Sequence, residues 1–252
     1  MKTMILTLIF LFTASLNAAV VGSVSKVVGS VKVKSEGSFK KSKVKLSQEI
    51  KEGDLVTTSS KGMAVINLVD GSSVVLDKSS SIHFAANNSL EQTGGKVFYK
   101  ITSRDAKNSL KIKTPFAIIG IKGTTFTVSA EKDNESVALK EGLVGIKSLK
   151  EEFKLYRKEM MAKYKSFVED QMSEYEKFKK GLTDPKPELT KEFDLEAGNV
   201  VSFADNVVKE SKFKEKMDAE FEAYEKMINE SFEKAKEESE KMPSDDKSVV
   251  EH

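Results

Sequence analysis

The chain of 252 residues contains no cysteine, and this absence excludes several kinds of site. Structural disulfides, thiolate metal sites, a cysteine nucleophile and a lipidated N-terminal cysteine all require that residue. Histidine is almost as scarce, with two in the chain. His252 lies in a polar tail, and His83 stands between Ile82 and Phe84 in a strand-like run. We therefore predict that His83 is a partly buried strand residue rather than a general base.

Catalytic motifs are missing as well. The chain has no Gly-x-Ser-x-Gly elbow and no His-Glu-x-x-His pair. The segment 120–125 has two glycines and a lysine, but strand-type residues follow where a phosphate loop needs a helix. Carboxylates are abundant, so a glycosidase-type pair stays open as a minor alternative. We predict no catalytic residue, no cofactor, no metal site and a protein that is not an enzyme.

Long apolar runs are limited to one, Met4–Phe12, near the N-terminus. Met1, Lys2 and Thr3 precede it and small or polar residues follow to Ala19, which is the order found in a secretory signal peptide. The run is shorter than the roughly 20 residues of a membrane-spanning helix. We expect residues 1–19 to be a signal peptide, cleaved after Ala18 or Ala19, and the protein to be periplasmic or exported without a remaining membrane span. An uncleaved anchor is the alternative.

Residues 20–146 consist of short β-type runs separated by glycine. Asp70-Gly71 predicts a hairpin between Met63–Val69 and Ser72–Leu76, because this dipeptide tolerates the positive φ of a two-residue turn. A glycine stands two residues before a valine at four places: Gly29, Gly95, Gly142 and Gly198. A glycine turn that repeatedly feeds a short strand is what stacked coils or a twisted sandwich need. Chance recurrence in a β-rich chain is the alternative.

Two segments have the pattern of amphipathic helices. Residues 149–180 lack glycine and proline, and we expect them to form a helix inside an insertion at 149–192, followed by a β segment to Phe203. A second helix is predicted at 205–241, followed by a disordered tail at 242–252. The apolar stripes that we select as a possible partner surface are Phe153, Tyr156, Met160 and Tyr164 in the first helix and Phe213, Met217, Phe221 and Tyr224 in the second. Exposed stripes would form a large apolar patch, so docking on the β domain, pairing with each other as a coiled coil, and a helix-mediated homodimer all stay open.

Charge divides at the same boundary. Residues 20–148 hold 20 Lys and Arg against 12 Asp and Glu, and residues 149–252 hold 20 against 27. Complementary charge can therefore guide the helices onto the β domain, unless both are simply solvated surfaces. Interspersed acidic residues argue against a nucleic-acid footprint, and the acidic helices argue against a membrane-surface helix.

Residues 20–203 resemble the FecR family domain. The most specific segment is Thr114-Pro115 followed by residues 117–126, where Gly120 and Gly123 are predicted to allow a turn or close backbone approach. The motif residues, taken as structural, are Gly29, Gly53, Asp54, Thr57, Asp70, Gly71, Gly95, Thr114, Pro115, Gly120, Gly123, Thr124, Phe126, Gly142 and Gly198. The resemblance implies a mainly β, solenoid-like or sandwich-like domain, here with a long inserted α-helix and a long C-terminal α-helix.

Well-known FecR-family members are regulators of iron uptake, with a cytoplasmic anti-sigma segment, one membrane span and a periplasmic domain. Three residues precede the apolar run here, so we expect no cytoplasmic anti-sigma segment. The leading hypothesis is a binding or scaffolding protein of the envelope that recognises a protein or glycan, with the helices as a brace or docking arm. The alternative is a periplasmic signal-transduction component that acts in trans with a membrane regulator of uptake. An enzyme acting on envelope polysaccharide is a third, weaker hypothesis.

Overall fold

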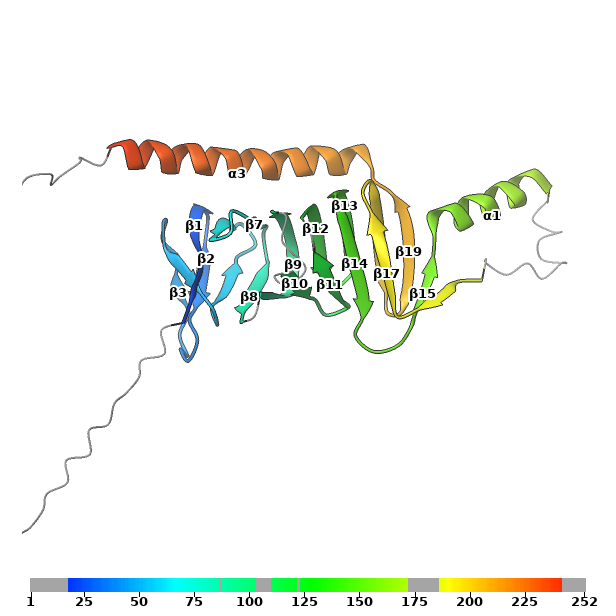
Figure 1. Ribbon diagram of the computed structural model, residues 1–252, viewed down its shortest axis with the longest axis horizontal. Coiled ribbons are helices and arrows are strands. Elements are labelled where there is room, and N and C mark those ends of the chain that lie inside the picture. Colours follow the sequence, from blue (N-terminus) through cyan, green and yellow to red (C-terminus); the bar gives the residue numbers. More distant parts are fainter. Residues whose placement is uncertain (1–17, 87, 103–109, 122, 172–185, 242–252) are drawn as a thin grey trace, which may run out of the picture.

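The computed structural model describes residues 18–86, 88–102, 110–121, 123–171 and 186–241. These residues form a long stack of β-strands with one helix along its length and another at its end (Figure 1). The mainly β prediction is confirmed, and the sheet is not closed on itself. The predicted signal peptide, apart from Ala18 and Ala19, and the predicted tail at 242–252 lie outside the described residues.

The strands pair in two groups, which we call sheet A and sheet B. Sheet A has the order β4 (Glu49–Lys51), β1 (Val20–Val28), β6 (Met63–Leu68), β7 (Ser73–Leu76), β9 (Ser89–Ile101), β12 (Thr124–Glu131), β13 (Asn134–Glu141), β18 (Asn199–Ala204), β19 (Val207–Lys212), β15 (Phe153–Tyr156) and β16 (Glu188–Thr190). Sheet B has the order β3 (Ser42–Lys43), β2 (Val31–Lys34), β5 (Leu55–Thr58), β8 (Ser81–Ala85), β9, β10 (Leu110–Lys113), β11 (Ala117–Ile121), β14 (Leu143–Ser148) and β17 (Glu192–Glu196). Neighbours are antiparallel except β9 with β10 and β15 with β19.

Glycines mark the places where the chain passes from one sheet to the other. Strand β9 belongs to both sheets and changes sheet at Gly95, which has φ +73°. Gly29, Gly142 and Gly198 separate strands of different sheets and also have positive φ. Residues with a Cβ rarely adopt this conformation. The recurring Gly-x-Val pattern therefore marks the turns at which the chain changes sheet.

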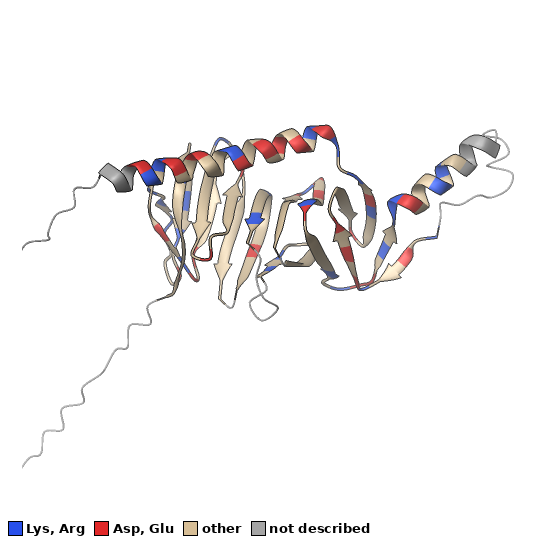
Figure 2. Cartoon of the chain, turned by 45° about the horizontal axis from the view of Figure 1, so that its top comes forward, with Lys and Arg blue, Asp and Glu red and all other residues tan. Residues whose placement is uncertain are grey.

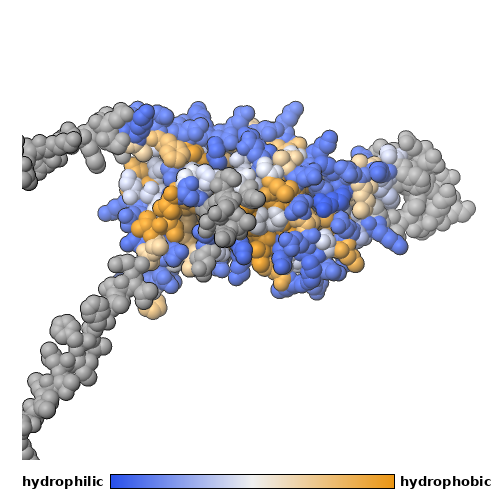
Figure 3. Space-filling view, viewed as in Figure 1, coloured by the Kyte–Doolittle hydropathy of each residue, from blue (hydrophilic) through white to orange (hydrophobic). Residues whose placement is uncertain are grey.

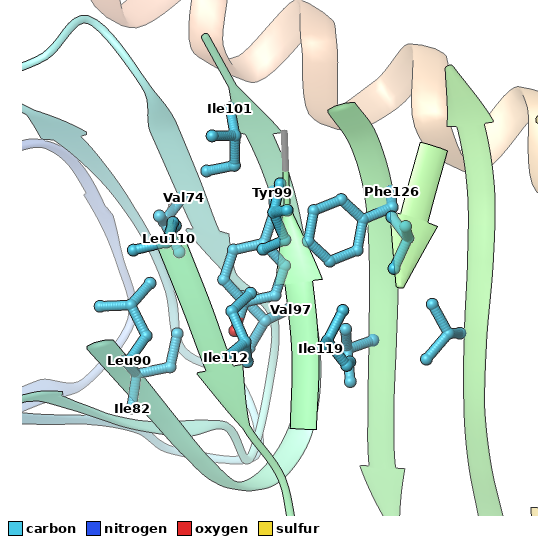
Figure 4. Close-up of a cluster of buried hydrophobic side chains, with 14 of the residues drawn as sticks. Val74, Ile82, Leu90, Val97, Tyr99, Ile101, Leu110, Ile112, Ile119 and Phe126 are labelled. Carbon is cyan, nitrogen blue, oxygen red and sulfur yellow. The ribbon is translucent and has the colours of Figure 1, made fainter. Parts of the chain in front are cut away.

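The main core lies between the two sheets and is built from inward-facing residues of both. The rings of Tyr99 and Phe126 stack with centroids 5.0 Å apart, beside Ile112 and Ile119 (Figure 4). The Tyr99 hydroxyl donates a hydrogen bond to Gln92 Oε1 at 2.9 Å, so this buried polar group is satisfied.

The predicted hairpin around Asp70 is present, but its turn is longer than expected. Residues 69–72 connect β6 to β7, and in this turn Gly71 has a positive φ while Asp70 does not. The carboxylate of Asp70 instead accepts hydrogen bonds from the backbone N–H and the hydroxyl of Ser72. The aspartate therefore stabilises the turn through its side chain.

The helix boundaries predicted from the sequence were wrong at both N-terminal ends. Residues 153–156 form β15, because Phe153 and Leu155 alternate with exposed Lys154 and pair with β16 and β19. The first helix, α1, runs from Lys158 to Gln171, and the rest of the expected span to residue 180 lies outside the described residues. Residues 207–212 form β19 on β18, so the second helix, α3, runs from Glu215 to Lys241 rather than from residue 205.

Candidate partner-binding surfaces

Helix α3 lies on the outer face of sheet A and covers an apolar strip there (Figure 1). The strip consists of one residue from each of five strands: Val65, Val75, Phe98, Ala138 and Val200. Helix positions Phe221, Tyr224 and Ile228 are buried on it, since steps of three and four place them on one side of α3. Of the arrangements left open by the sequence, docking on the β domain is the one that α3 adopts.

An aromatic cluster holds the middle of this contact. The ring of Phe98 lies 5.4 Å from Phe221 in an edge-on arrangement and 5.3 Å from Tyr224. Phe213 lies 5.1 Å from Phe221. Phe213, Met217, Phe221 and Tyr224 therefore pack within the chain. Phe221 and Tyr224 are buried, so their selection as a partner surface was wrong, whereas Phe213 and Met217 are half-buried.

Ion pairs surround the aromatic cluster. Lys26 of β1, Lys96 of β9 and Lys140 of β13 bind helix carboxylates. The Nζ–O distances are 2.8 Å to Glu230, 2.7 Å to Glu220 and 3.0 Å to Glu225, respectively. Figure 2 shows the mixed charges on the helix above the strands. The charge complementarity predicted from the sequence is confirmed for α3.

Two polar groups within the contact, Tyr224 and Lys140, have raised pKa values. Burial raises the pKa of Tyr224, and the carboxylates of Asp77 and Glu220 raise it further. The hydroxyl stays protonated and donates to Asp77 Oδ2 at 2.9 Å. The hydrogen bond to Glu225 raises the pKa of Lys140, which outweighs the lowering by burial.

These docking lysines and Asp77 were missed by the sequence reasoning. The lysine and glutamate of each pair are 204, 124 or 85 residues apart in the chain. Strand alternation predicts that a lysine is exposed, but it does not say which helix lies above it.

Helix α1 keeps part of the predicted stripe accessible. Phe153 is buried against Phe193 and Phe203, so it is not a surface residue, whereas Tyr156, Met160 and Tyr164 are half-buried. The helix projects from the end of the sandwich beside β19 (Figure 1).

Figure 3 shows hydrophilic residues along the edge where α3 lies and apolar residues gathered below it.

The family-motif residues lie mainly at turns and in the core. Gly53 and Gly123 have positive φ, and Asp54 is buried and accepts a hydrogen bond from Lys51 N–H. Phe126 and Thr124 are buried, Thr57 is half-buried on β5, and Pro115 is exposed at the β10–β11 turn.

Thr114 stabilises the β10–β11 turn through hydrogen bonds, in addition to the bend that was predicted from Pro115. Its Oγ1 accepts hydrogen bonds from the N–H groups of Phe116 and Ala117, and its own N–H donates to the carbonyl of Ala117. Gly120, by contrast, makes no close approach to any residue that the structure describes. A Cβ there would meet its nearest neighbour, the carbonyl oxygen of Gly145, at an ordinary 3.8 Å.

Among the described residues, no group of three His, Cys, Asp or Glu could hold a metal ion. His83 is half-buried on β8, as predicted, and its Nδ1 lies 3.4 Å from Glu91 Oε2. Burial raises the pKa of Glu91, but hydrogen bonds with His83 and Lys113 outweigh it and hold the pKa below its ordinary value. No described helix has the length and apolar character to cross a membrane.

A hollow of about 370 Å³ lies at the edge of the sandwich between the β10–β11 turn and the β18–β19 turn. Glu135 and Asp205 line it, together with Phe116 and Phe153. Burial raises the pKa of Glu135, and the charge of Asp205 adds to the effect.

The geometry defines a class, a two-sheet β domain with a helix strapped across one sheet. Residues 54–145 match the family model described as FecR protein, which confirms the expected FecR resemblance for this part of the chain. No match is found among curated proteins.

Solved structures give weaker likenesses. Two crystal structures of a Parabacteroides distasonis ATCC 8503 protein, described as "a putative anti-sigma factor", each align with a TM-score of 0.41 and 14% identity. The alignment covers 63% of this chain and 59% of that one. A "Cell surface anchoring domain" aligns over 27% of this chain and 87% of its own, with 31% identity and a TM-score of 0.25. The FecR resemblance therefore rests on residues 54–145.

Proposed function

We propose that the protein is a non-enzymatic signal-transduction component of the cell envelope. The observation that carries this proposal is the FecR domain at residues 54–145. The sequence alone favours a general binding or scaffolding role, with signal transduction as the alternative. The FecR domain favours the signalling alternative, in which the chain acts in trans with a membrane regulator of uptake. The proposed location is the periplasm, on the basis of the apolar run Met4–Phe12.

The two helices have separate tasks in this proposal. Helix α3 is the brace, because its apolar stripe is used within the chain. Helix α1 is the docking arm, because it projects from the sandwich and keeps Met160, Met161 and Tyr164 half-exposed. Methionine and tyrosine suit such a surface, since they offer adaptable apolar contact together with a polar tip.

The experiment is deletion of the gene followed by transcript profiling and complementation. We expect transcripts of an uptake system to change and the wild-type chain to restore them. A chain with Met160→Glu and Tyr164→Glu should fail to restore them, because two carboxylates desolvated in an apolar contact are costly. The matched control is Ala162→Glu with Lys163→Glu, at exposed positions of the same helix. An unchanged transcriptome after deletion contradicts the signalling role, and full restoration by the stripe variant contradicts the role of α1.

A further inference from the structure

The outer face of sheet B carries an ordered row of residues across four neighbouring strands. Lys111 of β10 lies beside Gly120 of β11, Gly120 beside Gly145 of β14, and Gly145 beside Asp194 of β17. Because side chains alternate along a strand, this row faces outward while the apolar residues on either side of it face the core. The row therefore presents a cation, two glycines and an anion, in that order.

The two glycines in this row are not required by the fold. Neither has a positive φ. A Cβ on Gly120 would have 3.8 Å to the nearest atom, and one on Gly145 would have 3.6 Å to Asp194 Oδ1. At Gly22 of β1, by comparison, a Cβ would lie 2.5 Å from a backbone oxygen. Glycine inside a strand weakens it and often marks a place where another backbone approaches closely.

The ends of the row are available for a partner. Lys111 and Asp194 are exposed, and within the described part of the chain neither forms an ion pair. The described helices pack elsewhere, α3 on the outer face of sheet A and α1 beside β19. Nothing among the described elements covers the row.

We propose that this face is the interface of a symmetric homodimer, with its twofold axis parallel to the strands and between β11 and β14. Such an axis exchanges the two ends of the row, so Lys111 faces the partner's Asp194 and Asp194 faces the partner's Lys111. Gly120 then faces the partner's Gly145, and without side chains there the two sheets can approach more closely than the usual 10 Å or so.

The order of charges selects a second copy as the occupant. A twofold interface places the same patch on both subunits, so the patch must be complementary to itself. The next row along the strands reads Lys113, Ile118, Lys147 and Glu192, so the same axis also opposes Lys113 to the partner's Glu192. Lys113 also pairs with Glu91 at 3.3 Å in its own sheet, so the central row carries most of the complementarity.

Sedimentation equilibrium of the purified protein over a concentration series tests the proposal. We expect a dimer, and we expect Lys111→Asp or Asp194→Lys alone to raise its dissociation constant about 100-fold, because each change creates two like-charge contacts per dimer. The double variant carrying both changes should restore the dimer, because the row is then reversed but again self-complementary. The matched control is Lys32→Asp, an exposed lysine of β2 on the same sheet, which should leave the dimer unchanged.

A steric test separates assembly from folding. Gly120→Val should keep or raise the melting temperature of the monomer, since valine suits an extended strand and has room, but it should abolish the dimer. A wild-type chain that stays monomeric at all concentrations overturns the proposal. So does a single charge reversal that leaves the dimer intact, or a double reversal that fails to restore it while keeping the native circular dichroism spectrum.

Discussion

At the scale of single residues, glycine positions determine how this chain crosses between its sheets. Gly142 has φ +91°, and a Cβ there would lie 2.5 Å from the carbonyl oxygen of Gly123. The two glycines thus support each other at neighbouring crossings, although 18 residues lie between them in the sequence. Gly120 belongs to the same family motif but has an ordinary conformation and open space. Glycines in one motif therefore have different physical roles.

Gly123→Val should lower the free energy of unfolding by about 1–3 kcal/mol, because a β-branched residue is strained at φ +66°. Urea unfolding at neutral pH measures the effect. Gly94→Val, in β9, is the control and should cost little, because Gly94 has no positive φ and a Cβ there would meet nothing within 4 Å. Equal stability losses for the two variants would contradict the assignment of Gly123 to the strained crossing.

At the scale of elements, the apolar periodicity of α3 predicts that a helix is present but does not predict its first residue. Its stripe of apolar residues at steps of three and four was readable from the sequence and is buried as such a pattern requires. The helix begins about ten residues later than expected, because residues 207–212 pair with β18 and β15. Local periodicity identifies a helix, but strand pairing with distant segments determines where the helix can begin.

Phe221→Ala should weaken the contact of α3 with sheet A by about 3–5 kcal/mol, because the buried ring packs on Phe98 and Phe213. We expect limited proteolysis within α3 to become faster while the sandwich stays resistant. Glu222→Ala, at an exposed position of the same helix, is the control and should cleave at the wild-type rate. Unchanged protection of α3 in the Phe221 variant would show that the aromatic cluster does not hold the helix.

Alkaline pH should also release α3. The pKa values of Tyr224 and Lys140 are raised in the folded protein from ordinary values of 10.0 and 10.5. Groups with a raised pKa contribute stability below the unfolded value and lose it as the pH rises, because the unfolded chain releases its protons first. Urea unfolding at about pH 8 and about pH 11 should therefore show a loss of stability.

Tyr224→Phe is the control for this loss, and it should make the loss smaller. Part should remain, because burial also raises the pKa of Tyr99 in the main core. A Tyr224→Phe chain with the full wild-type loss would exclude Tyr224 as a source of the pH dependence.

At the scale of the whole molecule, the chain combines a sandwich, a helix strapped across it and a helix that projects from it (Figure 1). The apolar strip beneath α3 is separate from the main core between the sheets. The sandwich therefore has its own core, and the strap closes the outer face of sheet A. Charge supports this arrangement, since basic strands meet an acidic helix.

Truncation after Lys212 should leave a folded sandwich with an uncovered apolar strip. We expect the far-ultraviolet circular dichroism spectrum to lose its helical part and keep its β part, and we expect the shortened protein to bind a hydrophobic dye. Truncation after Asp205 is a useful comparison, because it removes β19 and should destabilise sheet A itself. If the first variant were unfolded, α3 would be an integral part of the core rather than a strap.

Three properties follow from the sequence alone: the lack of thiol chemistry, the places where glycine interrupts the strands, and the presence of two amphipathic helical segments. These properties are local, because composition, backbone preference and side-chain periodicity act over a few neighbouring residues. Three others depend on the tertiary fold: Phe153 belongs to a strand, the stripe of α3 faces its own sheet, and each docking lysine meets a particular glutamate. Those outcomes depend on contacts between residues as far as 204 positions apart, which no short stretch of sequence specifies.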